Sequence, residues 1–299
     1  MTTQAVSRPR VELFVTDLDN TLWDWFDAWV RSFVPMAERV AELSGVPIEQ
    51  LYDEMRTVHQ ARGTAEYSWL LSELPSLQAL HGNDPVGLLA AYDDAIHLQH
   101  RERNAATRLY DGVLETLHEI RARHVPIVAY TESLQYWTAR RVQTLGLDGV
   151  IDALYSPPDH DRPAGIDLGQ VRFRPQDEYA LKATKHMHVG RGVVKPNPDV
   201  LRDILADQSA SAETTVYIGD SLVKDVAMAQ AVGVIDVYAR YGADAPQRPD
   251  YARLERVTHW TGEMVAAERR ANDMTGVVTP SYAVDSFAEL LSLFEFGAQ

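Results

Sequence analysis

Two aspartates separated by one residue follow an apolar run near the start of the chain. The run 11–15 is short enough for one buried strand, and Asp17 and Asp19 come directly after Thr16. In open α/β sheets, the carboxyl ends of parallel strands border the crevice that binds ligands. Because two buried neighbouring carboxylates are costly unless a cation or a proton compensates them, this strand end predicts a metal-assisted nucleophile.

Further polar side chains stand at comparable places later in the chain. They are Thr131 after the apolar run 125–130, Asp220 and Asp225 after the run 215–218, and Lys195 just before a helix. If the strands are parallel, all of them meet the first two aspartates at one edge of the sheet. Each signal alone is weak, because helix caps, Asx turns and solvated lysines have the same appearance. Their combination and order are specific.

The chain after residue 108 alternates between strand and helix candidates. Strands are predicted at 125–130, 150–155, 215–218, 234–238 and 281–284, and helices at 113–123, 134–145, 199–206, 223–231 and 287–294. Strands separated by helices of this length indicate βαβ units. The predicted fold class is therefore α/β, with a Rossmann-like parallel sheet as its core.

An all-helical module is predicted between the first strand and this alternating part. Helices are expected at 25–43, 47–60, 65–74 and 85–103, separated by breaks that contain Gly or Pro. The domain prediction is a core of residues 1–23 and 108–299 with an inserted helical module at 24–107. Two segments of the core, 156–194 and 242–278, do not follow the alternation.

The composition favours an enzyme in the cytoplasm. The 299-residue chain has 28 Lys and Arg against 43 Asp and Glu, a formal net charge of −15, and no cysteine. An acidic surface repels nucleic acids and anionic membranes, so we expect neither as a partner. The sequence has no cysteine for a disulfide framework or a thiolate metal site, and no apolar run of membrane-spanning or signal-peptide length.

The motifs in their order resemble the haloacid dehalogenase-like (HAD) superfamily of aspartate-nucleophile phosphohydrolases. The resemblance rests on Asp17-Leu18-Asp19-Asn20-Thr21-Leu22, then Thr131, then Lys195-Pro196, then Gly219-Asp220 with Asp225. It covers 10–24, 108–155 and 193–240, with a weaker tail at 280–295. It implies an HAD-like core in which the helical module is a C1-type cap, a lid that excludes water and selects the substrate.

The resemblance also implies the cofactor and the roles of four carboxylates. Asp17 would be the nucleophile that becomes an aspartyl-phosphate, and also a ligand of Mg²⁺. Asp19 would protonate the leaving alcohol, activate water, and bind the metal through its backbone carbonyl. Asp220 would be the second carboxylate ligand, and Asp225 would orient it or a metal-bound water.

The remaining predicted site residues concern the phosphoryl group and the substrate. By resemblance, Thr131 would hydrogen-bond a phosphoryl oxygen, and Lys195 would neutralise charge on the phosphoryl group and on Asp17. Glu132 is a departure from relatives that carry an amide there, and it adds a negative charge near the phosphate unless it points away or pairs with a base. Trp23 and Asp24 begin the helical module and are predicted to contact the substrate.

The segment 156–194 is long for a relative of this kind and contains several basic residues. We interpret it as a lid or interface with a basic face, or as a solvated loop. Its residues Lys182 and Lys185, and the later Lys224, compete with Lys195 for the phosphate role but lack its Lys-Pro-x-Pro setting. A metal site at His186 and His188 is a weaker hypothesis, because no third ligand stands out.

These features predict a Mg²⁺-dependent phosphatase for a small phosphorylated metabolite. The helical module argues against a protein substrate, which a cap would block. A 2-haloacid dehalogenase on the same fold is one alternative, although it would have no use for an acid at Asp19. A phosphomutase and a catalytically degenerate protein for binding or assembly are the others. The sequence leaves the oligomeric state open, with a homodimer among the options.

Overall fold

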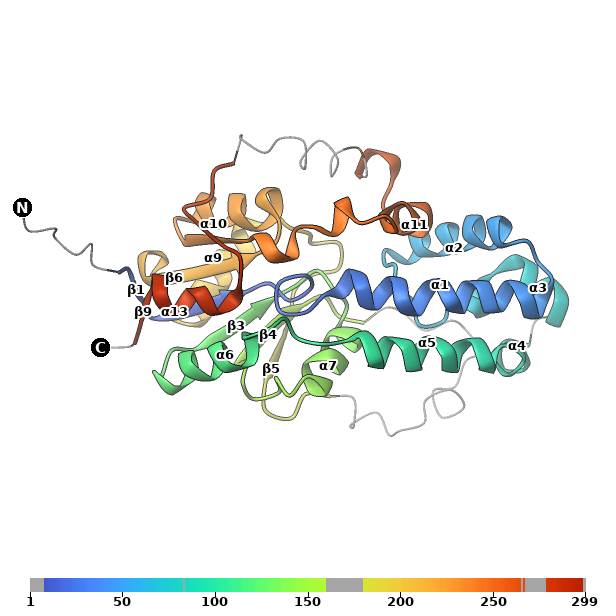
Figure 1. Ribbon diagram of the computed structural model, residues 1–299, viewed down its shortest axis with the longest axis horizontal. Coiled ribbons are helices and arrows are strands. Elements are labelled where there is room, and N and C mark those ends of the chain that lie inside the picture. The colour runs from blue at the N-terminus through green and yellow to red at the C-terminus, as the bar shows by residue number, and fades with distance from the viewer. Residues whose placement is uncertain (1–7, 83, 160–179, 265, 267–277, 298–299) are drawn as a thin grey trace, which may run out of the picture.

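A sheet of seven parallel strands lies at the centre of the molecule, so the predicted α/β fold class is confirmed. In this computed structural model the described residues are 8–82, 84–159, 180–264, 266 and 278–297. The strand order β5-β4-β3-β2-β6-β7-β8 places β2 in the middle. In Figure 1 the sheet lies at the left, and the helices α2, α3 and α4 lie at the right. The strands are β2 Leu13–Thr16, β3 Ile127–Tyr130, β4 Ala153–Ser156, β5 Lys185–His188, β6 Thr215–Gly219, β7 Ile235–Ala239 and β8 Tyr282–Val284.

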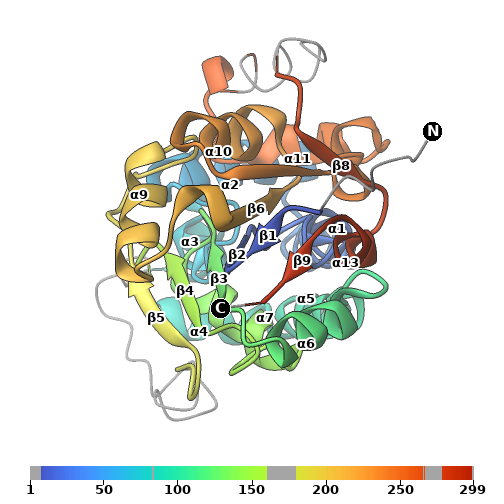
Figure 2. The same cartoon turned by 90° about the vertical axis from the view of Figure 1, so that its left-hand side faces the viewer.

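Helices cover both faces of this sheet (Figure 2). The side chains of β2 alternate between the two faces. Phe14 packs in an apolar cluster that includes residues of α6 (Val113–Ala122), α7 (Gln135–Thr144) and α13 (Leu290–Leu293). Leu13 and Val15 pack in the opposite cluster, with α9 (Pro198–Asp207) and α10 (Ala227–Val232). A strand covered on both faces is apolar throughout, which explains the run seen in the sequence.

The run 11–15 forms two strands rather than the single strand predicted. β1 (Arg10–Val11) pairs in parallel with β9 (Glu295–Phe296) in a separate two-stranded sheet. The chain changes partner at Glu12, whose backbone N–H donates to the carbonyl of Thr214 at 2.8 Å. The two ends of the described chain therefore lie side by side, as Figures 1 and 2 show.

An edge strand, β5, lies in the segment 156–194, which the sequence predicts to be outside the sheet. It pairs in parallel with β4, with Met187 opposite Tyr155. Its side chains are exposed or half-buried, so it lacks the apolar pattern from which strands are predicted. His186 Nε2 lies 2.7 Å from Ser156 Oγ, and no potential metal-binding group found in the described part of the chain includes a histidine. Residues 160–179 of this segment lie outside the described residues.

The helical insert, here residues 24–107, follows β2 directly. It contains α1 Trp25–Ser44, α2 Ile48–Arg62, the 3-10 turn η1 Leu70–Glu73, α3 Pro75–His81, α4 Pro85–Ala91 and α5 Asp93–Ala106. The helix predicted at 65–74 is wrong, because Leu74 is extended before Pro75 and a new helix begins at that proline. The helix predicted at 85–103 is two helices that meet at the buried Tyr92. Over the described ranges, no helix combines the length and apolar character needed to cross a membrane.

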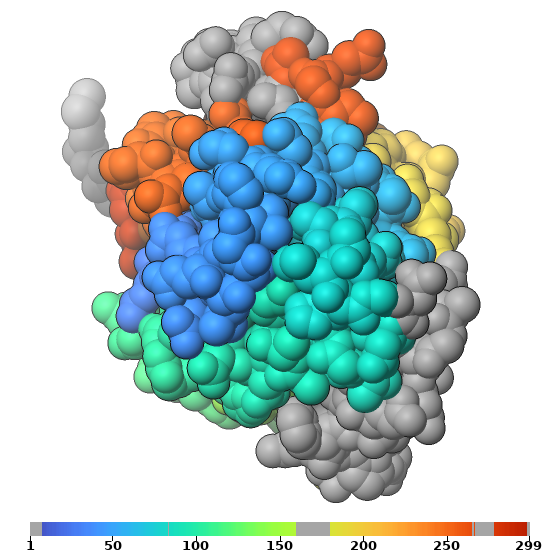
Figure 3. All heavy atoms as spheres, turned by 90° about the vertical axis from the view of Figure 1, so that its right-hand side faces the viewer, coloured from blue at the N-terminus to red at the C-terminus, as the bar shows by residue number. Residues whose placement is uncertain are grey.

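A helix from the segment 242–278 joins the apolar cluster of the helical insert. This helix is α11 (Tyr251–Val257), which lies beside α2 (Figure 1). Its Leu254 and Val257 are buried in the cluster together with α1 and α2 residues. Arg56 on α2 donates to the carbonyl of Glu255 at 2.8 Å, and His59 Nδ1 lies 2.6 Å from the carbonyl of Val257. Figure 3 views this end of the molecule, where the blue and teal atoms of the insert form most of the visible face. The insert is thus built from two distant parts of the chain.

Candidate active site

The carboxyl ends of β2, β3 and β6 open into one cavity of 530 Å³ below the helical insert. Asp17 follows β2, Thr131 follows β3 and Asp220 follows β6, and all three line the cavity. The strands are paired in register, with Thr16 beside both Ala129 and Ile218. The parallel sheet therefore brings together the strand ends that the sequence predicts to meet.

Asp17, Asp220 and Asp225 form a compact carboxylate group. Each offers one oxygen, and these oxygens lie within 4.8 Å of one another. Asp225 is buried and accepts hydrogen bonds from Tyr217 Oη at 3.0 Å and from the backbone N–H of Ser221 at 3.1 Å. A Cβ at Gly219 would lie 2.3 Å from Asp225 Cγ, so the approach of this carboxylate requires glycine there.

Lys195 is the cation within this group. Its Nζ lies 2.7 Å from Asp17 Oδ1 and 2.9 Å from Asp225 Oδ1, with 3% of the side chain exposed. The rings of Tyr130 and Tyr217 flank the ammonium at 5.1 and 5.7 Å. Its two carboxylates raise the pKa of Lys195 well above its usual value despite burial, so the lysine stays charged.

The three carboxylates carry more negative charge than one lysine compensates. Burial raises the pKa of Asp17 to about 7, Lys195 opposes this rise, and Asp225 adds to it. Burial and the charge of Asp17 also raise the pKa of Asp220. A hard divalent cation binds oxygen ligands and would relieve this repulsion. The donor set of Asp17, Asp220 and Asp225 fits Mg²⁺, and no sulfur or imidazole ligand accompanies it among the described residues.

The side chain of Asp19 lies next to this group but faces other partners. Trp23 Nε1 donates to its Oδ1 at 2.7 Å, Ser133 Oγ donates to its Oδ2, and Arg141 Nη1 lies 3.6 Å from Oδ1. Burial raises the pKa of Asp19, and Arg141 together with the two hydrogen bonds opposes the rise. These contacts hold the carboxylate at the cavity wall. The predicted metal contact of Asp19 is through its backbone carbonyl, not through this side chain.

Thr131 and Glu132 both line the cavity, but their contacts differ. Thr131 is buried and its Oγ1 accepts the backbone N–H of Ser133 at 3.1 Å. Glu132 accepts the backbone N–H of Lys195 at 2.8 Å and the Nζ of Lys224 at 2.9 Å. Burial alone would raise the pKa of Glu132, yet Lys224 and Lys195 lower it overall. The extra charge is therefore paired with bases, and Glu132 positions the segment that carries Lys195.

Trp23 and Asp24 do not line the cavity, contrary to their predicted contact with substrate. Trp23 is fully buried in the core next to the sheet, because its ring packs with the apolar cluster while its N–H serves Asp19. Asp24 caps α1 by accepting the backbone N–H of Asp27 at 2.8 Å, and it pairs with Arg248 at 2.6 Å. The residues at the start of the insert that line the cavity are the next two, Trp25 and Phe26.

Sequence comparison agrees with this geometry. A sequence model described as a haloacid dehalogenase-like hydrolase matches residues 11–233, which is well over half of the chain. The chain belongs to the haloacid dehalogenase-like hydrolase family. No curated protein matches this hydrolase.

Solved structures of the same fold resemble this hydrolase over most of its length. A 2-haloacid dehalogenase from Pseudomonas syringae pv. Tomato is 18% identical, with 95% of this chain and 97% of that one covered and a TM-score of 0.51. The HAD-hydrolase YfnB from Bacillus subtilis, bound to magnesium, is 14% identical, with coverages of 96% and 99% and a TM-score of 0.50. A HAD phosphatase from Thermococcus onnurineus is 14% identical, with 95% and 97% covered and a TM-score of 0.50. At these identities the likeness shows the fold alone.

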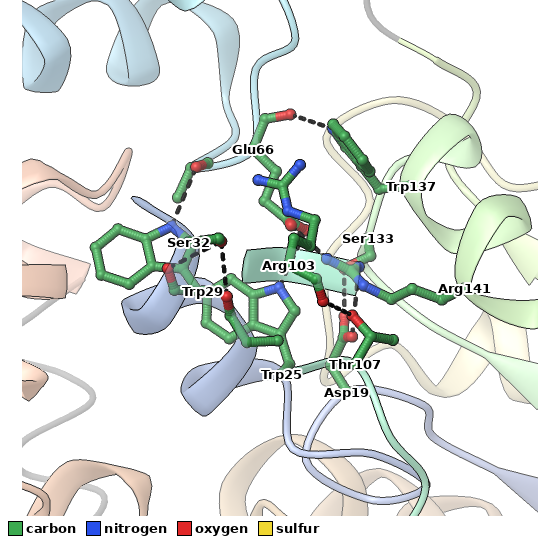
Figure 4. A network of polar contacts seen from close by, with 12 residues as sticks. Asp19, Trp25, Trp29, Ser32, Glu66, Arg103, Thr107, Ser133, Trp137 and Arg141 are labelled. Carbon is green, nitrogen blue, oxygen red and sulfur yellow. Dashed lines mark hydrogen bonds and ion pairs between the residues drawn. The ribbon is translucent and has the colours of Figure 1, made fainter. Parts of the chain in front are cut away.

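A buried charged network that the sequence analysis does not anticipate links the helical insert of this hydrolase to Asp19 (Figure 4). Arg141 on α7 pairs with Glu66 of the insert, and their side chains are 5% and 7% exposed. Glu66 also accepts the indole N–H of Trp25 at 3.0 Å, while its backbone carbonyl accepts that of Trp137 at 2.8 Å. Arg141 and Glu66 are 75 positions apart, so no local pattern in the sequence joins them.

Proposed function

We propose that this hydrolase is a Mg²⁺-dependent phosphatase that acts on a small phosphorylated metabolite through an aspartyl-phosphate intermediate. The observation that carries the proposal is the convergence of Asp17, Asp220 and Asp225 around Lys195 in one cavity. A phosphate monoester is a dianion, so a carboxylate cannot attack it without compensating positive charge. Bound Mg²⁺ would supply that charge and bring the phosphoryl group next to the nucleophile.

The residues of the chain account for the first chemical step. Asp17 attacks phosphorus, and the bond to the leaving oxygen breaks as the aspartyl-phosphate forms. Lys195 holds the attacking carboxylate from 2.7 Å and stabilises charge on the phosphoryl oxygens. Thr131 accepts the N–H of Ser133, which leaves its own hydroxyl proton to donate to a phosphoryl oxygen.

Asp19 has the position of an acid and base for both steps. It gives a proton to the leaving alkoxide and then takes one from the water that attacks the aspartyl-phosphate. The raised pKa of Asp19 favours the protonated form that the first step needs. Trp23, Ser133 and Arg141 surround the carboxylate and fix its direction.

The helical insert favours a small substrate. The cavity that contains Asp17 is also lined by residues 61–66 of the insert and by residues of the segment 245–264, which contains α11 and is called the α11 segment below. A cavity of 530 Å³ under such a cover is of the size that encloses a metabolite. A folded protein that carries a phosphate would have to displace the cover.

Dehalogenation is the second candidate reaction, because a 2-haloacid dehalogenase is among the structures of the same fold. Displacement of halide from carbon by Asp17 needs no metal and no acid. The ester formed on Asp17 would then need one base to activate water for its hydrolysis. Dehalogenation has no use for an acid at Asp19 or for a group of three carboxylates that fits a metal, which is why we favour phosphate transfer. A phosphomutase would use the same carboxylates and differs by slow hydrolysis of the phosphoenzyme.

The test is to compare the two reactions in one preparation. Phosphate release from p-nitrophenyl phosphate and chloride release from 2-chloropropionate are measured with Mg²⁺ and with EDTA. We expect phosphate release that requires Mg²⁺ and is lost in Asp17→Asn, while Asp27→Asn, an exposed acid of α1 paired with Arg31, keeps it. Chloride release that persists in EDTA, without phosphate release, would reject the proposal.

A further inference from the structure

Four aromatic residues contribute to the lining of the cavity. Trp25 and Phe26 come from the start of α1, and Tyr251 and Trp260 come from the α11 segment. The ring of Phe26 lies 5.7 Å from that of Tyr251, which lies 6.4 Å from that of Trp260. We call these four residues the aromatic wall. The ring of Tyr251 is tilted by 52° against that of Phe26 and by 46° against that of Trp260. Aromatic rings in a cavity offer apolar contact area to the ring of a ligand.

The aromatic wall is held rigidly from both sides. At the beginning of the α11 segment, Arg248 pairs with Asp24 at 2.6 Å. At its end, Arg56 donates to the carbonyls of Glu255 and Trp260, at 2.8 and 3.4 Å. A surface fixed before binding loses little conformational entropy when a ligand arrives, which favours selective recognition.

The charges around the cavity do not match a second anionic group on the substrate. Among the described lining residues, six carboxylates face four cationic side chains: Asp17, Asp19, Glu66, Glu132, Asp220 and Asp225 against Arg62, Arg191, Lys195 and Lys224. Arg62 pairs with Glu73 at 2.5 Å, Lys224 pairs with Glu132 at 2.9 Å, and Arg191 donates to the carbonyl of Asp159 at 2.5 Å. The cations away from the reacting centre are thus engaged by the protein itself.

Two polar atoms interrupt the apolar lining close to the aromatic wall. Thr258 Oγ1 and His259 Nδ1 are buried and have no hydrogen-bond partner among the residues that the structure describes, and both residues line the cavity. Burial lowers the pKa of His259 to about 4, so its imidazole is neutral near pH 7. Both groups can hydrogen-bond an uncharged polar substituent.

We propose that the aromatic wall selects phosphate monoesters whose alcohol carries an uncharged aromatic ring, with Thr258 and His259 binding a polar substituent of that ring. This substrate class rests on the proposed phosphatase function. The phosphoryl group would lie at Asp17 and Lys195, and the ring would lie against Tyr251 and Trp260. A second phosphate or a carboxylate on the alcohol would lower binding, because carboxylates outnumber basic side chains among the described lining residues.

The first experiment compares alkyl phosphates that share a leaving-group type. With Mg²⁺, kcat/KM is measured for 2-phenylethyl phosphate, its 4-hydroxyphenyl and 4-carboxyphenyl analogues, ethyl phosphate and glycerol 1-phosphate. Burial of a phenyl ring predicts at least a tenfold preference for 2-phenylethyl phosphate over ethyl phosphate. The hydroxyl analogue is expected to be better still, and the carboxylate analogue worse. Equal kcat/KM for the phenylethyl, ethyl and glycerol esters would overturn the inference.

The second experiment tests whether the aromatic wall causes the preference for 2-phenylethyl phosphate. Trp260→Leu keeps apolar volume but removes the ring, and we expect about a fivefold loss in kcat/KM for 2-phenylethyl phosphate, with Trp260→Phe restoring most of it. The loss should appear mainly in KM, with ethyl phosphate unaffected. Trp69→Leu is the matched control, because Trp69 belongs to the same apolar cluster of the insert but does not line the cavity.

The outcomes separate the substrate class from the proposed function. If Trp260→Leu and Trp69→Leu lose activity equally on both esters, the wall has no selective role and the inference is rejected. If p-nitrophenyl phosphate and all the alkyl esters are left intact by the wild-type protein, the phosphatase proposal fails and the substrate class fails with it. If glycerol 1-phosphate is hydrolysed as fast as the aromatic ester, only the substrate class fails.

Discussion

The buried pair between Glu66 and Arg141 gives the sharpest prediction about stability. Their side chains are 7% and 5% exposed, and the pair joins the helical insert to α7 of the core. Glu66→Gln keeps the size of the side chain and removes its charge. The guanidinium of Arg141 is then left buried, with Asp19 as the nearest carboxylate recorded for it, at 3.6 Å.

The size of the effect follows from this geometry. Removing one partner of a buried ion pair costs about 3–5 kcal/mol when the other charge remains buried. Asp19 still compensates part of the charge of Arg141, but Glu66 also faces the buried guanidinium of Arg103, so we expect a loss within this range, about 4 kcal/mol. In urea, the midpoint should fall while the slope of the transition stays constant, since the surface exposed on unfolding is unchanged.

The pH dependence of this loss has a definite sign. The pKa of Glu66 is lowered in the folded state from its ordinary 4.5, chiefly because Arg141 overcomes the effect of burial. A lowered carboxyl pKa stabilises the fold above the unfolded-state value and is lost as the pH falls through the folded-state value. The difference in unfolding free energy between wild type and Glu66→Gln should therefore be full at pH 7 and shrink below about pH 4.5.

The assay is urea unfolding of both proteins from pH 7 down to the acid limit of wild-type folding. Glu42→Gln is the matched control, because Glu42 forms a 3.0 Å pair with Arg39 on the exposed face of α1. We expect no measurable change in its midpoint, since solvent screens an exposed pair. A Glu66→Gln midpoint equal to that of wild type at pH 7 would refute the account of the network.

Two further predictions concern the site. Lys195→Met removes the cation that opposes the raised pKa of Asp17. The acid limb of the profile of kcat/KM against pH should therefore move to higher pH. An acid limb at the same pH as in wild type would show that Lys195 does not lower the pKa of Asp17. Gly242→Ala places a Cβ 1.6 Å from the carbonyl oxygen of Asn20, which lies in the loop of the two aspartates, so this variant should have a lower melting temperature and less phosphatase activity. Gly262→Ala is the control, because its Cβ would have nothing within 4 Å. Equal melting temperatures for the two variants would contradict this prediction.

The sequence could predict that the site residues at the strand ends meet, because their meeting depends on the hydrophobic pattern of the strands and on the parallel topology of the sheet. The apolar run before Asp17 and the alternation of strands with helices determine a parallel sheet, and a parallel sheet brings Asp17, Thr131 and Asp220 to one edge. The edge strand β5 could not be found in this way. Neither face of β5 is fully buried, so its sequence does not need the apolar pattern from which strands are predicted.

The contacts between distant segments explain the rest of the differences. Their position at the start of the insert predicts that Trp23 and Asp24 face the substrate. In the structure Trp23 donates to Asp19 and Asp24 pairs with Arg248, so both side chains stabilise the fold. The packing of α11 on the helical insert joins residues some 200 positions apart. Such contacts follow from shape in three dimensions, and neither charge nor hydropathy patterning in one segment reveals them.

Phosphorylation of Asp17 can be observed by trapping the aspartyl-phosphate. Protein mixed with p-nitrophenyl phosphate and Mg²⁺ is quenched in acid and digested, and the phosphorylated peptide is identified by mass spectrometry. Asp19→Asn should form the phosphoenzyme poorly and lose it slowly, so the trapped species persists in that variant. We expect a phosphoryl group on Asp17 of the wild-type protein and none on the Asp17→Asn variant. Turnover in wild type with the phosphoryl group on another residue, or with full activity in Asp17→Asn, would contradict this expectation.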